Sequence, residues 1–174
     1  MSMESGKLYF FTATILNWNH LLADDECKQI ITNEWRRLVE LNRISIYAFV
    51  VMPNHYHTIW SVREGYNPEG IQRDFHKWTA RQLIAWMRVH KPLLLEEFRV
   101  NGADRAIQIW ERNPLPIELY SEEVIWQKLE YIHNNPCQVN WRLSALPELY
   151  HFSSAQYYLL NKDTWGFITH IQEA

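Results

Sequence analysis

The stretch of sequence that decides the fold spans residues 44–62 and reads ISIYAFVVMPNHYHTIWSV. Its first part, from Ile44 to Met52, is nearly all apolar, which predicts a strand buried on both faces of a sheet. Pro53 and Asn54 mark a turn, and the alternating residues from His55 to Val62 predict a second strand. Because so short a connection leaves no room for a crossover, we expect the two strands to be antiparallel neighbours.

Further strands and helices are predicted on both sides of this pair. Leu8 to Leu16 is rich in aromatic and β-branched residues, as strands are. Apolar residues recur at helical spacing after Asp24 as far as Asn42. Later in the chain we expect a helix from Gly70 to His90, a short helix from Leu93 to Phe98, a fourth strand from Ala106 to Trp110 and a last helix from Ser121 to Asn134, which ends before Pro136.

The predicted order of elements is β-α-β-β-α-β followed by a helix. It indicates the α+β class, with a ferredoxin-like antiparallel sheet, helices on one face and a C-terminal helix that carries a tyrosine. The length of 174 residues predicts a single domain that spans residues 1–174.

The charge pattern bears on the class of partner. The formal net charge is −3, which argues weakly against a nucleic-acid partner. Residues 73–99, however, carry six basic and three acidic side chains. Arg73, Lys77 and Arg81 in this segment are therefore candidates for contacts with DNA phosphates, and a solvated helix face is an equal alternative. Lys128, later in the chain, is a fourth candidate for DNA binding. The 9 Trp, 9 Tyr and 7 Phe serve either as core or as platforms for unpaired bases.

Cysteine usage and hydropathy favour an intracellular protein. Cys27 and Cys137 lie far apart in the sequence, which predicts two reduced thiols rather than a disulfide framework. No stretch approaches the ~20 apolar residues needed to cross a membrane, and residues 1–7 are polar and lack a secretory segment. We expect a cytoplasmic protein without a membrane partner.

The tripeptide His55-Tyr56-His57 is the first candidate site. Residues two apart on a strand point to the same face, so the two imidazoles project side by side and Tyr56 packs on the opposite face. Two neutral imidazoles on one face can bind one divalent cation. As surface ligands they are expected to contribute little to packing. The alternative is two histidines that share a strand by chance.

The second candidate is the pair Tyr131 and Asn135, one turn apart on the last predicted helix. The Asn135 side-chain carbonyl oxygen suits a hard cation, and the Tyr131 phenol becomes a nucleophile if a nearby cation stabilises its anion. Lys128 on the same side is one such cation, unless it pairs with Glu130 or Glu123. Alternatively, these residues only end an amphipathic helix.

Three tracts resemble one known family. Val50 to His57 resembles the histidine-hydrophobic-histidine (HUH) box of the insertion-sequence single-tyrosine transposases. Tyr131-Ile132-His133-Asn134-Asn135-Pro136 is similar to the tyrosine-helix signature of their REP-associated relatives, and Phe152 to Ala155 to a Trp-Ser-Ser tract of those relatives. The similarity spans residues 7–158. His133 belongs to the second tract but lies on another helix face from Tyr131, so we expect no catalytic role for it.

The resemblance implies a ferredoxin-like fold, a Mg²⁺ or Mn²⁺ ion held by His55, His57 and Asn135, and Tyr131 as the nucleophile. The implied activity is single-stranded DNA cleavage beside a hairpin and strand transfer through a 5′-phosphotyrosine, in DNA transposition or in the processing of repeated palindromes. The implied protein works as a monomer or a homodimer. The alternatives are a non-catalytic hairpin-binding protein with the same fold and, less well supported without a cysteine pair, a structural zinc protein.

Overall fold

A four-stranded antiparallel sheet forms the centre of the molecule. The computed structural model describes residues 3–102, 106–112, 114 and 116–174. Within these ranges the strands are β1 (Leu8–Thr14), β2 (Ile44–Val51), β3 (His55–Val62) and β4 (Ile117–Glu118), in the spatial order β2-β3-β1-β4. This is the strand order of a ferredoxin-like sheet, and the predicted α+β class and the antiparallel β2–β3 pair are confirmed.

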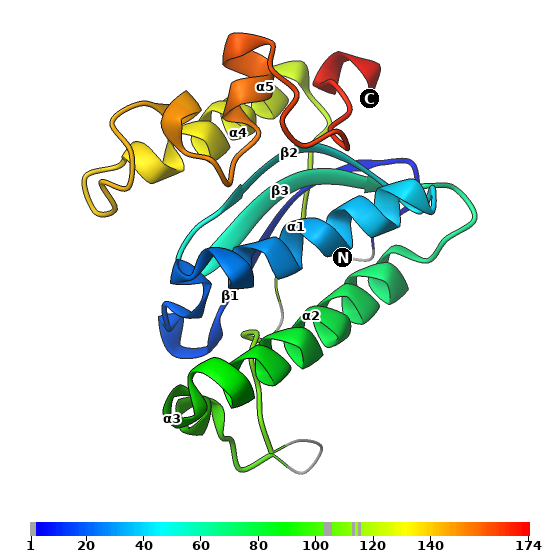
Figure 1. Cartoon of the computed structure of the whole chain (residues 1–174). Coiled ribbons are helices and arrows are strands. Elements are labelled where there is room, and N and C mark those ends of the chain that lie inside the picture. The colour runs from blue at the N-terminus through cyan, green and yellow to red at the C-terminus, as the bar shows by residue number, and fades with distance from the viewer. Residues whose placement is uncertain (1–2, 103–105, 113, 115) are drawn as a thin grey trace.

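Helices lie on both sides of the sheet (Figure 1). On one face lie α1 (Asp25–Glu40) and α2 (Pro68–His90), and on the other α4 (Glu122–Asn134) and α5 (Ala155–Leu160). The predicted short helix after α2 is α3 (Pro92–Leu95) followed by a 3₁₀ turn. Short 3₁₀ segments span Leu16–Trp18, Leu21–Ala23, Glu96–Phe98, Asn135–Cys137, Pro147–Leu149 and Ile171–Glu173. No described helix has the length and apolar character needed to cross a membrane.

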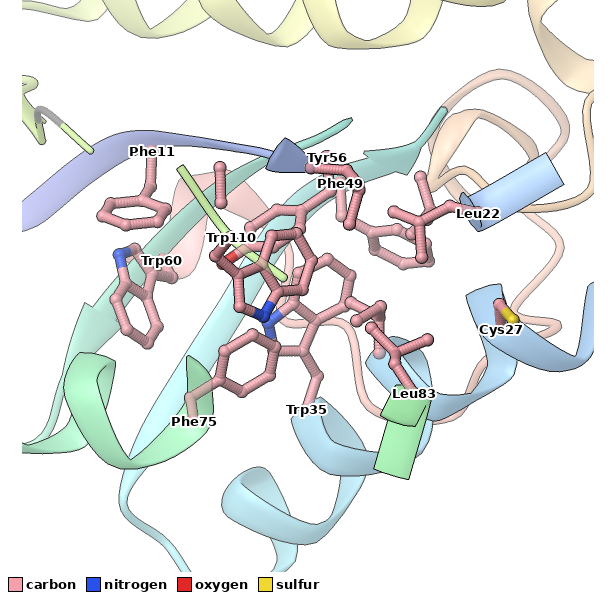
Figure 2. Packing of buried hydrophobic residues seen from close by; sticks show 14 of the residues in the cluster. Phe11, Leu22, Cys27, Trp35, Phe49, Tyr56, Trp60, Phe75, Leu83 and Trp110 are labelled. Atoms are coloured by element: carbon pink, nitrogen blue, oxygen red, sulfur yellow. The ribbon is translucent and has the colours of Figure 1, made fainter. Parts of the chain in front are cut away.

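Large aromatic side chains fill the space between the sheet and the α1–α2 layer (Figure 2). The Trp35 ring lies 5.1 Å from the Tyr56 ring and stacks on Phe75 at 5.9 Å. Tyr56 thus packs on the face opposite the two histidines, as predicted. Cys27 is buried in the same core, and both it and Cys137 are free thiols, in agreement with the prediction.

A second apolar cluster lies between the sheet and α4. It contains Phe10, Val50 and Ile59 from the strands and Leu129 and Ile132 from the helix. Because both faces are covered, every residue of β2 is buried, as its apolar run predicts. Every residue of β3 is buried as well, although its sequence alternates with polar residues. The face of β3 that carries the histidines is therefore an interior surface.

The prediction of a strand from Ala106 to Trp110 is wrong. This segment makes only isolated bridges, among them the bridge between Ile15 and Trp110. The fourth strand is β4, whose two residues pair with Tyr9 and Phe10 of β1. An edge strand of two residues is too short to show a periodic pattern in the sequence. The apolar residues near Trp110 look like a strand because they are buried, but they do not pair in a continuous strand ladder.

The C-terminal region covers the outer edge of β2. The Val51 amide donates to the Phe152 carbonyl oxygen (2.9 Å), and the Ser154 amide donates to the Phe49 carbonyl oxygen (3.0 Å). An exposed strand edge presents unpaired amides and carbonyls that invite association with other chains. The tract from Phe152 to Ser154 satisfies these groups from within the chain.

Candidate active site

The register of the sheet places the histidine pair beside two threonines of β1. Thr12 lies opposite His57, and Thr14 lies opposite His55. The two imidazole rings stand 4.7 Å apart between centroids. Strand pairing therefore brings the two histidines together, as their i, i+2 spacing predicts.

Each histidine is held through its Nδ1 atom. His55 Nδ1 lies 2.6 Å from Asn54 Oδ1, and His57 Nδ1 lies 2.7 Å from Thr12 Oγ1. The asparagine oxygen can only accept, so Nδ1 of His55 carries the proton and Nε2 carries the lone pair. The Thr12 hydroxyl accepts equally well when His57 adopts the same tautomer. Metal-binding histidines in proteins are commonly oriented by such a bond to the other ring nitrogen.

Both rings are interior groups, so the expectation that they are surface ligands with little packing is wrong. His55 is 6% exposed and His57 is 5% exposed, and the His57 ring stacks on Phe10 at 5.2 Å. Burial lowers the pKa of His55 to about 4, against a smaller opposing effect of the Asn135 side chain. Burial, assisted by the nearby His55 and Lys128, lowers the pKa of His57 to about 3. Both imidazoles are therefore neutral at neutral pH, the form that binds metal ions.

The end of α4 supplies the third predicted ligand. The helix begins at the Ser121 cap, whose Oγ accepts from the Val124 amide, and ends at Asn134 before Pro136. Asn135 keeps helical angles (φ −54°, ψ −47°) as the C-cap, so it still projects one turn beyond Tyr131. Its side chain is buried, on the side of the helix that faces the histidines.

Two buried polar atoms at this place lack a hydrogen bond. Within the described residues, three buried side-chain atoms have no partner: His57 Nε2, Asn135 Oδ1 and, on the opposite face of the sheet, Trp60 Nε1. An unsatisfied buried polar group is costly, so a clustered pair calls for an explanation. His57 Nε2 and Asn135 Oδ1 are the donor atoms that a divalent cation would use, so these residues fit a metal ion. Among the described residues no group of three or more His, Cys, Asp or Glu side chains could hold a metal ion, so an ion at this place would also need the Asn135 amide oxygen.

Tyr131 lies against this group within a single chain. Its ring is 5.2 Å from the His57 ring and 6.1 Å from the Phe10 ring, and 42% of the residue is exposed. Lys128 Nζ lies 4.8 Å from the centroid of Phe10 and 5.8 Å from that of Tyr131. In the described part of the chain Lys128 forms no ion pair with Glu123 or Glu130, which leaves its charge directed at the two aromatic rings.

A buried hydrogen bond connects α4 to the edge of the sheet. His133 Nε2 lies 2.8 Å from Ser154 Oγ, and the same hydroxyl oxygen accepts from the Phe49 amide at 3.0 Å. His133 is thus a packing residue on a helix face other than that of Tyr131, as the helical spacing indicates. Through Ser154, the Phe152–Ser154 tract therefore connects the helix that carries Tyr131 to strand β2.

Sequence reasoning missed the residues that orient the two histidines. Nothing in a single sequence pairs Thr12 with a residue 45 positions later, since only the strand register does so. The sequence pattern indicates Asn54 only as part of a turn and does not by itself show that its side chain bonds to His55. The polar side chain directly before the histidine pair was the signal that could have identified it.

Three of the basic residues predicted to bind DNA lie on α2, on the opposite face of the sheet from α4, the helix that carries Tyr131 and the fourth candidate, Lys128 (Figure 1). Arg73, Lys77 and Arg81 are exposed and line a cavity of about 590 Å³ between α2 and residues 107–112. Glu111 and Arg112 line both this cavity and a smaller one beside the histidine pair. The DNA-binding role of the three basic residues stays a prediction.

Comparison with known proteins was made at the levels of sequence and structure. No protein-family model and no curated protein sequence matches this chain. Among solved structures, a REP-associated tyrosine transposase bound to a REP hairpin matches with a TM-score of 0.65 and 19% identity, over 97% of this chain and 86% of that chain. A protein from Deinococcus radiodurans R1, provisionally assigned as a transposase, gives a TM-score of 0.47 and 18% identity over 77% of this chain and 97% of that one. The chain therefore has the fold of a REP-associated tyrosine transposase, the class of protein that its motifs resemble.

Proposed function

We propose that this protein cleaves and rejoins single-stranded DNA through a covalent 5′-phosphotyrosine at Tyr131, with the help of a Mg²⁺ or Mn²⁺ ion. His55, His57 and Asn135 would hold the ion. The proposal includes DNA transposition and the processing of repeated palindromes, because both use the same cleavage and transfer steps.

The observation that carries the proposal is the position of the Tyr131 ring 5.2 Å from the His57 ring, together with two buried side-chain atoms that have no partner among the described residues, His57 Nε2 and Asn135 Oδ1. A bound divalent ion would satisfy both atoms, with its remaining positions open to water and a phosphate oxygen. When bound, such an ion supplies Lewis acidity to the phosphate.

The residues of the chain account for the rest of the chemistry. The Tyr131 oxygen forms a bond to phosphorus, the bond from phosphorus to the 3′ oxygen breaks, and the tyrosine proton ends on the released 3′-hydroxyl. One phosphoester replaces another, so a second 3′-hydroxyl can reverse the step on a new end without a nucleotide cofactor. Lys128 stabilises the developing phenolate, because its ammonium group lies near the Tyr131 ring.

A DNA hairpin is the proposed partner. The solved structure of the same fold described above is bound to a REP hairpin. We infer a hairpin with a single-stranded extension for this chain. The histidines and Asn135 beside Tyr131 are buried, so a flexible single strand reaches them more easily than a rigid duplex does.

The test uses a pool of labelled hairpin oligonucleotides with randomised single-stranded flanks, incubated with the protein and Mn²⁺. We expect a covalent adduct on a denaturing gel, which mass spectrometry maps to the peptide that contains Tyr131. Tyr131→Phe should abolish the adduct. Tyr120→Phe is the matched control, because Tyr120 is 85% exposed just before α4 and should leave the yield unchanged.

The same experiment separates the proposal from its alternatives. Tight hairpin binding without an adduct, under all metal conditions, would identify a non-catalytic binding protein with this fold. An adduct that persists in Tyr131→Phe would show that another nucleophile acts. Bound-metal analysis that finds stoichiometric zinc with no effect of Mn²⁺ would favour a structural zinc protein.

A further inference from the structure

One large aromatic side chain next to the histidine pair has no packing role. Trp18 is 63% exposed and belongs to neither apolar cluster of the described chain. Its nearest aromatic contact is the His55 ring, at 6.5 Å in an edge-to-face arrangement. Single exposed aromatic residues are common, but this indole stands beside a candidate catalytic histidine, where its flat apolar face is available for an unpaired base to stack on.

The backbone holds Trp18 in a defined place. Asn17 and Trp18 both have positive φ angles (55° and 56°), which residues other than glycine rarely adopt. The Asn17 amide donates to Glu111 Oε1 at 2.7 Å, and Asn54 Nδ2 donates to the Trp18 carbonyl oxygen at 3.3 Å. Asn54 Oδ1 meanwhile accepts from His55. One amide side chain therefore connects the position of Trp18 to the orientation of a proposed metal ligand.

A small cavity of about 220 Å³ lies beside Trp18. It is lined by Thr12, whose hydroxyl bonds to His57, and by Thr14, which lies opposite His55 in the sheet, so the cavity lies beside the histidine pair. Its lining combines one aromatic face with hydroxyl, carboxylate and guanidinium groups that can meet the edge of a base: Thr12, Thr14, Trp18, Glu111, Arg112 and Pro114.

We propose that Trp18 and this cavity bind one unpaired nucleobase, that of the nucleotide next to the phosphate presented to Tyr131. The inference rests on the proposed DNA partner but not on cleavage. Every base has a π face, so stacking on an indole tolerates any sequence, whereas the polar lining adds a preference among bases. The site also explains how a flexible strand is fixed beside the nucleophile, since a held base restrains the phosphate attached to it.

The test measures binding in a Tyr131→Phe background, so that it does not depend on cleavage. The probe is a hairpin with a single-stranded extension that carries 2-aminopurine at each position in turn. We expect fluorescence quenching at one position, its loss in Trp18→Ala, and binding weaker by roughly five- to 150-fold. Trp18→Phe should restore part of the affinity. Tyr66→Ala is the control, because Tyr66 is an exposed aromatic residue beyond the opposite end of β3.

The outcomes distinguish the two proposals. Equal affinity and an unchanged quenching profile in folded Trp18→Ala would overturn the base site, even if the wild-type protein forms its adduct. Quenching that depends on Trp18 without any adduct in the wild type would support the base site and reject cleavage. Failure of every variant to bind the single-stranded extension would overturn both.

Discussion

The two faces of the sheet hold histidines in different ways. On the α1–α2 face, His76 is half-buried and lines the larger cavity, and its Nε2 lies 2.8 Å from the Tyr56 hydroxyl. On the α4 face, His57 is bonded only through Nδ1, and its Nε2 has no partner among the described residues. In the described parts of the chain, one buried donor, Trp60 Nε1, lacks a partner on the first face, whereas on the second face Asn135 Oδ1 lacks one in addition to His57 Nε2. Acceptors that gather around a neutral imidazole attract a cation, whereas an isolated donor does not.

His57→Ala should have the largest effect, because it removes a proposed metal ligand from the face of the sheet that α4 covers. We expect a loss of cleavage larger than the roughly 10- to 100-fold that removal of an outer partner of a metal ligand costs. Because His57 is buried and bonded to Thr12, the variant should also lose about 1–3 kcal/mol of stability. The measurements are adduct yield per folded protein and thermal unfolding. His76→Gln is the matched control on the other face and should lose stability but keep cleavage. Wild-type cleavage by folded His57→Ala would refute the metal assignment.

A mixture of His57→Ala with Tyr131→Phe sharpens this result. Since Tyr131 already lies 5.2 Å from His57 of its own chain, we expect no recovery of activity in the mixture. Recovery would mean that two chains exchange the tyrosine helix to form the working site.

Thr12→Val should have the next largest effect. Valine keeps the shape of threonine but removes the hydrogen bond to His57 Nδ1, so we expect Mn²⁺ affinity or cleavage to fall roughly 10- to 100-fold. Thr58→Val is the control on a neighbouring strand, because its hydroxyl donates to the Ala48 carbonyl oxygen rather than to a histidine. Titration with Mn²⁺ measures the shift. Equal losses in the two variants would show that Thr12 acts through stability alone.

His133→Gln should have the smallest effect, which concerns how the free energy of unfolding changes at acidic pH. Burial lowers the pKa of His133 to about 4, from about 6.5 for an unperturbed histidine. Between these values the unfolded chain binds the proton and the folded chain does not, so this contribution is present above pH 6.5 and is lost as pH falls towards 4. Glutamine can still bond to Ser154 but does not titrate. The variant should therefore show a slope of unfolding free energy against pH that is shallower by up to about 1.4 kcal/mol per pH unit. Denaturant titrations from pH 4 to 7 check this, and a slope equal to that of the wild type would contradict it.

Local patterns were enough to predict the central part of the fold and the shared strand face of His55 and His57. The apolar run of β2, the turn at Pro53-Asn54 and the i, i+2 histidines depend only on neighbours in sequence, as does the i, i+4 pair of Tyr131 and Asn135. Helix and strand periodicity relate such neighbours directly to a shared face.

What the sequence did not reveal depends on contacts between distant segments. The strand register decides that Thr12 meets His57, and the cover of α4 decides that both histidines are buried. The fourth strand was misplaced because the two residues of β4 are specified by their pairing with β1 and not by their own hydrophobicity. The sequence alone does not distinguish Trp18 from the other aromatic residues, because its exposure depends on how the chain folds around it.

The attachment of residues 152–154 to the edge of β2 has a consequence for biosynthesis. A chain emerging from the ribosome completes β1, β2 and β3 long before the tract that covers that edge. Until then β2 offers an unprotected row of backbone amides and carbonyls to any other nascent chain. Premature termination ahead of Phe152 is therefore expected to yield a product that self-associates through this strand edge.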